Sequence, residues 1–326
     1  MKLYNLCRFR LVALLGLLGL GWPALGGAGL QLDSIVVRYP AGFTKVLAWD
    51  VAPFLTDPAL QEGVIGPLLG MNHPLAGPVR TLQLFQIPPE DVEFVAHGEG
   101  PDVASFTLIQ GPSFRQTFGA LQGLRAAVGA PGSPFTRWAM ERVEGLPVVF
   151  VGGQFGPVAI EWAYIPLAQA LWVGTEVAFL PGQPDVERLR ATTERVVRRV
   201  LGRPDVGYFD ELHVAVQLKD GQLAFVRRSL SEERPLEPGE QAMGFTLSLE
   251  SAPASSVRGR FVLRFDSVDA ARRAVERLDQ GTSPYLGQAL YRAQLVGVQR
   301  NGRVVTADVA TDLRGLVGLL QLVLPF

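Results

Sequence analysis

The stretch GRFVLRFDSVDAARRAVERLDQG, residues 259–281, constrains the fold more than any other part of the chain. Alternating apolar side chains in its first part predict a strand. Ser267 then stands at the N-cap position of a helix with one apolar face, and Gly281 stands just after that helix. A strand followed by a one-sided helix predicts a layered α+β arrangement in which the helix covers a sheet.

The elements that follow extend this unit. Asn301 and Gly302 lie between two alternating runs, which is a strong signal of a β-hairpin. A last helix is expected to begin at Thr311 or Asp312, so the order is β-α-β-β-α. Residues 103–202 show a similar order, with a strand at 103–111, a helix capped by Ser113, further strands, and a helix that begins at Pro184 or Asp185.

The sequence therefore predicts an α+β protein of two related lobes, each an antiparallel sheet with helices packed on one face, like ferredoxin-like ββα halves. Residues 1–29 are expected to be a signal peptide or anchor. The first lobe spans 30–205, with a Pro/Gly-rich insertion at 51–90, and the second spans 206–326. Residues 129–145 are expected to form a loop.

The N-terminus indicates export. Three positive charges and no acid in the first ten residues precede an apolar run from residue 11 and small residues near 24–29, as in a secretory signal. An uncleaved anchor over residues 11–30 is the alternative. Cys7 is the only cysteine and precedes the apolar run, so a cleaved chain has neither a disulfide nor a thiol nucleophile. Export without disulfides favours a bacterial envelope, that is the periplasm, the cell surface or the extracellular space.

Composition limits the classes of partner. The chain has 326 residues, 48% of them hydrophobic, and a net charge of −1. That length suits one large or two ordinary domains. Because no basic stripe stands out, nucleic acid is not an expected partner.

Two segments resemble a known set of proteins. YPAGFTKVLAWDVAPFL at 39–55 has a Pro-Ala start and a strand that ends in Asp50, and IPPEDVEFVAHGEG at 87–100 has a turn at Pro89, Glu90 and Asp91. In these features the chain resembles exported bacterial envelope proteins that contain a domain of unknown function. The resemblance implies an exported, two-lobed α+β protein and supplies no catalytic residue.

No motif predicts a metal, a cofactor or a nucleophile. The three histidines, His73, His97 and His213, have no further ligand at metal-binding spacing. GPSFR at 111–115 lacks the second glycine of a nucleophile elbow, so Ser113 is interpreted as a helix cap. The glycine-rich residues 151–156 lack the Lys-Ser/Thr end of a phosphate loop and are interpreted as a turn.

Three carboxylates are candidates for acid–base chemistry. Glu161 and Glu176 lie on neighbouring expected strands, and Asp308 lies on another. A carboxylate pair can act as acid and base when about 5–9 Å apart. Solvated strand faces are the favoured interpretation of these acids.

Other residues are candidates for contact with a ligand or partner. Trp138 lies beside Arg137 and Arg142 in the expected loop, whereas Trp162 and Trp172 are interpreted as core. The C-terminal helix is apolar on nearly every side, so it either packs over the sheet or contacts a membrane or partner. Its candidate contact residues are Leu316, Leu320, Val323 and Phe326.

These observations favour an exported, non-catalytic binding or scaffold protein of the cell envelope. Its partner is expected to be a protein or an apolar ligand, with peripheral membrane contact through the C-terminal helix or the N-terminal anchor. Two alternatives remain open: a protein that holds an apolar or lipid-like ligand between the lobes, and a carboxylate-dependent hydrolase.

Export gives the first testable prediction. A tagged full chain is expected in the periplasmic, membrane or secreted fraction, because residues 1–29 direct it there. Cell fractionation measures this, and deletion of residues 1–29 is the control that should return the protein to the cytosol. Recovery of the full chain wholly in the cytosol would contradict export.

Overall fold

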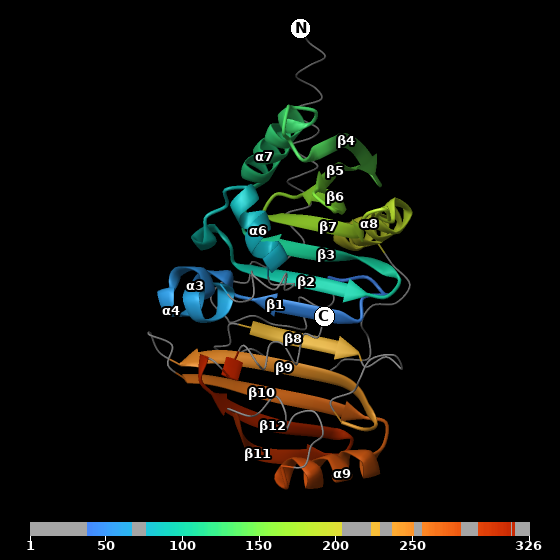
Figure 1. Ribbon diagram of the computed structural model, residues 1–326. Helices are drawn as coiled ribbons and strands as arrows, with labels where there is room; N and C mark the ends of the chain where they lie inside the picture. Colours follow the sequence, from blue (N-terminus) through green and yellow to red (C-terminus); the bar gives the residue numbers. More distant parts are fainter. Residues whose placement is uncertain are drawn as a thin grey trace.

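The computed structural model describes residues 38–66, 76–203, 223–228, 237–250, 256–281, 293–313 and 315–316. Its twelve strands form one antiparallel sheet in the order β11-β12-β10-β9-β8-β1-β2-β3-β7-β6-β5-β4 (Figure 1). The strands are β1 (Lys45–Trp49), β2 (Phe94–Gly100), β3 (Val103–Gln110), β4 (Phe135–Val143), β5 (Leu146–Phe155), β6 (Val158–Pro166), β7 (Ala170–Phe179), β8 (Leu223–Arg228), β9 (Glu240–Glu250), β10 (Ser256–Phe265), β11 (Ala293–Asn301) and β12 (Val304–Thr311).

Helices cover both faces of this sheet. They are α3 (Val51–Thr56), α4 (Pro58–Leu60), the π-helical turn η1 (Gln61–Ile65), α6 (Ala76–Leu84), the 3-10 turn η2 (Pro89–Asp91), α7 (Phe114–Ala127), α8 (Val186–Val200) and α9 (Val268–Asp279). Apolar residues of α3, α6, α7 and α9 pack in the core on one face, which we call face A. Those of α8 pack in the core on the opposite face, face B.

The helix starts confirm the predicted caps. Ser113 and Gln116 form a capping box at α7, in which each side chain binds the backbone of the other residue. Asp185 accepts from the backbone N–H of Arg188 at α8, and Ser267 accepts from that of Ala270 at α9. Gly302, at the turn between β11 and β12, has a φ of +59°, a left-handed conformation that glycine adopts without strain. These signals are local, so the sequence alone is sufficient to predict them.

Strand β1 joins the two halves of the sheet. It pairs antiparallel with β2 on one side and with β8 on the other. In the second pairing Leu47 lies opposite Phe225 and Trp49 lies opposite Leu223, and all four side chains are buried. The chain before and after residues 204–222 therefore contributes to a single hydrogen-bonded sheet.

The predicted fold of two ferredoxin-like lobes is wrong. One sheet crosses both expected lobes, seven strands coming from the first and five from the second, and helices α7 and α8 lie on opposite faces rather than on one. The alternation of apolar residues identifies a strand but not its partner, so it did not predict the β1–β8 pairing. The expected repeat is not supported, and the boundary expected at residues 205 and 206 falls at the start of a stretch, 204–222, outside the described residues.

The expected loop at 129–145 is also wrong, because its second half is the strand β4. Within the described part of the chain this strand pairs with β5 alone, and it lies at the end of the sheet. Its side chains are mostly half-buried, because an edge strand packs against a neighbour on one side only. A strand of this kind lacks the apolar run by which a central strand is recognised.

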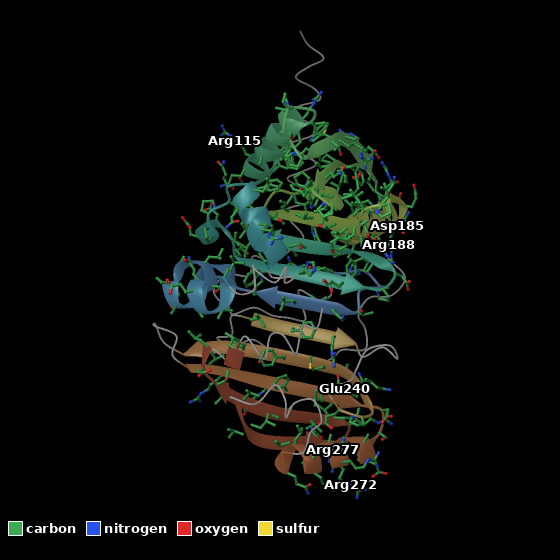
Figure 2. All side chains as sticks on the ribbon, in the orientation of Figure 1. Arg115, Asp185, Arg188, Glu240, Arg272 and Arg277 are labelled. Atoms are coloured by element: carbon green, nitrogen blue, oxygen red, sulfur yellow. The ribbon has the colours of Figure 1, made fainter. Side chains whose placement is uncertain are left out.

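Buried ion pairs hold the start of β9. Arg227 on β8 donates to Glu240 at 3.3 Å, and the Glu237 backbone N–H donates to the other oxygen of Glu240 at 3.2 Å. Arg277 of α9 donates to Glu237 at 2.8 Å. Figure 2 places Glu240 and Arg277 in the half of the molecule that carries α9. Removing one partner of such a buried pair is costly, because it leaves an uncompensated charge.

The close approach of α8 to β7 gives a prediction. A Cβ at Gly174 on β7 would lie 2.4 Å from Phe106 Cζ and 3.0 Å from Leu189 Cδ1. We expect Gly174→Ala to lower the free energy of unfolding by about 1–3 kcal/mol through overpacking. Denaturant unfolding of the full chain measures this.

The matched control is Gly119→Ala in α7. Gly119 is exposed, and a Cβ there meets no atom within 4 Å. This change is expected to be neutral or stabilising by up to about 1 kcal/mol, because alanine favours helix more than glycine does. Equal unfolding free energies for the two variants would contradict the packing argument.

Candidate functional site

Exposed apolar side chains gather at one end of strands β5, β6 and β7. Of the eight large hydrophobic residues that are exposed in the described part of the chain, four lie there, and Phe179 is the most exposed at 73%. The four are Phe155, Val177, Phe179 and Leu180, and we call them the apolar tip. Exposed apolar residues that cluster together mark interaction sites more often than apolar residues that are exposed singly.

The strand register places these residues together. Val158 of β6 lies opposite both Phe155 of β5 and Phe179 of β7, and the next same-face pair joins Ile160 to Val177. Directly opposite side chains in an antiparallel pair point to the same face. The Leu180 N–H donates to the Pro157 carbonyl at 2.8 Å, which fixes the end of β7 beside the β5–β6 turn.

Aromatic rings support the tip from inside. Phe155 contacts Trp162 edge-on with 5.8 Å between ring centroids, and Phe135 contacts both of these rings. Phe135 and Trp162 are half-buried and pack against the face A core. The exposed Phe155 ring is thus held in place, so little side-chain freedom is left to lose when a partner binds.

Sequence reasoning missed the apolar tip. The only local signal was the position of Phe155 before Gly156 and Pro157, and of Phe179 and Leu180 before Pro181. Apolar residues next to turn residues end a strand at the surface. That signal does not show that two strand ends lie side by side, because the register decides this.

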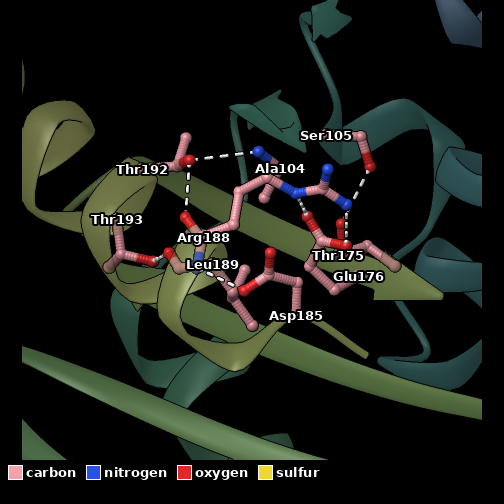
Figure 3. Close-up of polar contacts among 9 residues, drawn as sticks. All are labelled: Ala104, Ser105, Thr175, Glu176, Asp185, Arg188, Leu189, Thr192 and Thr193. Carbon is pink, nitrogen blue, oxygen red and sulfur yellow. Dashed lines mark hydrogen bonds and ion pairs between the residues drawn. The ribbon is translucent and has the colours of Figure 1, made fainter. Parts of the chain in front are cut away.

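On face B, helix α8 is held to the sheet by arginines. Arg188 donates to both oxygens of Glu176, each at 2.6 Å, while Asp185 caps the same turn (Figure 3). Thr192 accepts from the Ala104 backbone N–H at 3.0 Å, which ties α8 to β3 as well (Figure 3). Bidentate arginine–carboxylate pairs of this kind fix orientation as well as charge.

The pattern repeats along the helix. Arg190 binds both oxygens of Glu141 at 2.7 and 2.8 Å, and Arg198 donates to Glu144 at 3.1 Å. Arg203, just beyond the helix, also binds Glu144. The cations belong to α8 and its C-terminal end, and the acids belong to the strands and turns below, so charge complementarity sets where the helix lies on face B.

The candidate acids Glu161 and Glu176 do meet, since they lie directly opposite each other on β6 and β7. Their expected position on solvated faces is wrong, because Glu176 is buried and Glu161 is half-buried. Arg137 binds Glu161 at 2.7 Å across Gly152, where a Cβ would lie 2.7 Å from the Glu161 carboxylate. The two carboxylates therefore bind separate arginines of the same chain, Arg137 and Arg188, rather than each other.

The third candidate acid, Asp308, is bound in the same way. Arg260 donates to its two oxygens at 2.7 and 3.3 Å, across the β10–β12 pair. All three acids that the sequence offered for acid–base chemistry therefore have an arginine partner. Their arrangement fits sheet stabilisation better than proton transfer.

A shallow cleft of about 390 Å³ lies on face A between α3, η1 and α6. Its lining consists of apolar side chains and three glutamines, Gln61, Gln83 and Gln86. The Gln61 amide already donates to the Leu55 carbonyl. Because no ionisable side chain lines it, this cleft offers no charge for the recognition of a ligand.

His97 forms a polar chain that the sequence did not predict. Its Nδ1 lies 2.8 Å from Thr107 Oγ1 on β3, and its Nε2 lies 3.1 Å from Glu99 Oε1. A hydroxyl, an imidazole and a carboxylate in series resemble a catalytic triad. Thr107 is buried, however, and the cleft described above is lined by other residues, so we interpret this chain as a cross-strand link between β2 and β3. His73 and His213 lie outside the described residues.

The other candidate contacts divide between core and surface. The Trp138 indole N–H donates to the Leu121 carbonyl at 3.1 Å, and its ring lies under Arg125, so it joins β4 to α7. Arg142 is exposed and donates to the Gly145 carbonyl. Leu316 is fully buried, which places the start of the C-terminal helix in the core. Leu320, Val323 and Phe326 lie outside the described residues.

The described residues contain neither a metal-binding cluster nor a membrane-spanning helix. No group of three or more His, Cys, Asp or Glu side chains is arranged there to hold a metal ion. None of the helices in those ranges has both the length and the hydropathy needed to cross a membrane. Comparisons with protein-family models, with curated proteins and with solved structures gave no match.

The α8 ion pairs give a pH-dependent prediction. The Arg190 side chain, which hydrogen-bonds to Glu141, lowers the pKa of that carboxyl below its ordinary value of 4.5. A lowered pKa stabilises the fold above the unfolded pKa, and this stabilisation is lost as the pH falls through the folded pKa. Because both groups are partly exposed, we expect Glu141→Gln to cost only about 0.5 kcal/mol at pH 7.

The expected cost shrinks as the pH falls from about 6 to 3, because the wild-type carboxyl then becomes neutral itself. Denaturant unfolding across this range measures it. Glu194→Gln, at an exposed position on α8, is the control for a general effect of losing one negative charge. A cost of Glu141→Gln that stays constant over the whole range would rule out the ion pair as its cause.

Proposed function

We propose that this chain is an exported, non-catalytic binding protein of the bacterial cell envelope, and that the apolar tip holds a protein partner. The observation that carries the proposal is the clustering of half of the exposed large hydrophobic residues at one strand end, within the described part of the chain. The arginine-bound state of Glu161, Glu176 and Asp308 argues against the hydrolase alternative.

The chemistry of the tip favours a protein over a lipid surface. Its four residues are uncharged, and two of them are phenylalanines, of which Phe155 is supported by the rings of Phe135 and Trp162. Aromatic side chains in a rigid setting are typical of the centre of a protein interface. A surface that binds anionic lipid instead gains most of its affinity from lysine and arginine.

The alternative of an apolar ligand held between two lobes receives less support. The two halves meet edge to edge through the β1–β8 pair, so backbone hydrogen bonds and buried side chains occupy their junction. The cleft between α3, η1 and α6 lies within the first half and is open and shallow. A drug-sized apolar ligand requires a deeper, more enclosed pocket.

A photo-crosslinking amino acid at Phe179 tests the proposal. In cells that naturally make the protein, this position is expected to form an adduct with one discrete protein partner, because its side chain is the most exposed of the tip. Val268, exposed on α9 in the other half, is the matched control and is expected to give no such adduct. Adduct formation at Phe179 is measured by immunoblotting after irradiation.

A second substitution makes this result specific. Replacing Val177 by Thr and Phe155 by Ser should reduce the adduct formed at position 179 and leave the fold intact, because both replaced side chains are exposed. Equal adduct patterns at Phe179 and Val268 would overturn the proposal, and so would adducts with lipid alone.

A further inference from the structure

Among the described residues, strand β4 has a neighbouring strand on one side only, so it forms one edge of the sheet. It is the last strand in the order, and its pairing with β5 is regular from Arg137 to Val143. It contains neither lysine nor proline, the residues that usually protect an edge from pairing with another chain. Its charged side chains are Arg137, Glu141 and Arg142, and its regular part presents backbone donors and acceptors to a strand of complementary charge that can lie alongside it.

The opposite edge of the sheet is built differently. Strand β11 has an irregularity between Val296 and Gln299, and Gly297 within it has a φ of +65°. A bulge of this kind twists an edge away from further pairing. Strand β4 also has a register shift, between Phe135 and Arg137, but this lies at the start of the strand, so β4 is regular along most of its length and β11 is not.

The sequence of β4, FTRWAMERV, is complementary to itself when it is reversed. If two copies pair antiparallel with Ala139 opposite Ala139, then Arg137 of each copy faces Glu141 of the other. In the same register Trp138 faces Met140, and both side chains lie on face A. Opposite charges and apolar pairs placed directly across two strands are the contacts that stabilise such a pairing.

Neighbouring registers lose this complementarity. In an antiparallel pair, directly opposite side chains point to the same face. If the pair has two-fold symmetry, one residue must therefore lie opposite its own copy, with the axis between them. Centred on Met140, the pairing places Arg137 opposite Val143 and Glu141 opposite Ala139. Centred on Trp138, it places Arg137 opposite Ala139 and leaves Glu141 beyond the regular part of the pairing. Charge complementarity therefore selects the register centred on Ala139.

The side chains concerned are available for this contact. Arg137 is 38% exposed and uses one nitrogen, Nη2, to bind Glu161, while Glu141 remains 39% exposed although Arg190 binds it. Met140 is 51% exposed on face A. Pairing would cover Met140 with Trp138 of the second copy, and would continue the ion-pair row of face B from one copy into the next.

We propose that two copies of this chain join through β4 about a two-fold axis at Ala139, so that their sheets become one continuous sheet. A homodimer with closed two-fold symmetry also ends the growth of the sheet at this edge, because the same surface is used on both copies. This interface does not include the four residues of the apolar tip, so an experiment that contradicts one of the two proposals leaves the other unaffected.

Disulfide trapping tests the register. The full chain with Cys7→Ser and Ala139→Cys has a single thiol, at position 139. In the proposed dimer the two cysteines at this position lie opposite each other with a Cα separation of about 4.5–5.5 Å, which a disulfide can bridge. Mild oxidation is expected to give a covalent dimer, seen on a non-reducing gel. Met140→Cys and Val296→Cys, in the same Cys7→Ser background, are the matched exposed controls on β4 and on the other edge.

Sedimentation equilibrium of the full chain in mild detergent tests the association itself. The wild type is expected to be a dimer at micromolar concentration, and Ala139→Asp is expected to weaken it at least about tenfold, because like charges then meet at the axis. Circular dichroism of the variant controls for folding. Glu194→Gln, away from β4, should leave the dimer unchanged.

Each result decides the proposal in one direction. Faster trapping at position 139 than at 140 and 296, together with a dimer that Ala139→Asp weakens, supports it. A monomeric wild type, or trapping at 139 no faster than at 296, overturns it. Faster trapping at 140 than at 139 overturns the register and with it the charge argument.

Discussion

Strand β1 has two hydrogen-bonding edges, and both are occupied, by β2 on one side and by β8 on the other. A short strand of five residues in this position makes the sheet continuous between the two described halves of the chain. Leu47 and Trp49 bury their side chains against Phe225 and Leu223, so the backbone ladder is reinforced by packing. If this pairing were absent, each half would expose a strand edge with apolar flanks, which is a hazard for aggregation.

The second constraint is the distribution of charge between α8 and the sheet. The helix supplies arginines and the strands supply glutamates, and side chains such as Arg188 and Glu176 bind each other through two hydrogen bonds. This arrangement explains why acidic residues can lie beneath a helix on an otherwise apolar face. It also explains how Glu161 and Glu176 can lie opposite each other on neighbouring strands, because each of them binds a separate arginine.

The sequence predicts the local features of this fold and misses the long-range ones. Ser113, Asp185 and Ser267 were predicted as caps because a cap depends on its own helix turn. The partner of β1 was not predicted, since alternation says nothing about which strands pair. The arginine partners of Glu161 and Glu176 were missed for the same reason: each pair joins residues from different elements, and only the fold brings them together.

The strand that sequence reasoning placed in a loop, β4, is also the one for which an association is proposed, and the two facts share a cause. An edge strand buries less of each side chain, so its pattern is mixed rather than apolar, and residues such as Arg137 and Glu141 keep part of their surface. The partial exposure of its side chains thus makes an edge strand hard to recognise in the sequence and also leaves it able to bind. The proposed contact through Phe179 likewise depends on the strand register, because the register decides which strand end lies beside this residue. In a protein without recognisable motifs, candidate binding surfaces are therefore best sought where strands end or lack a neighbour.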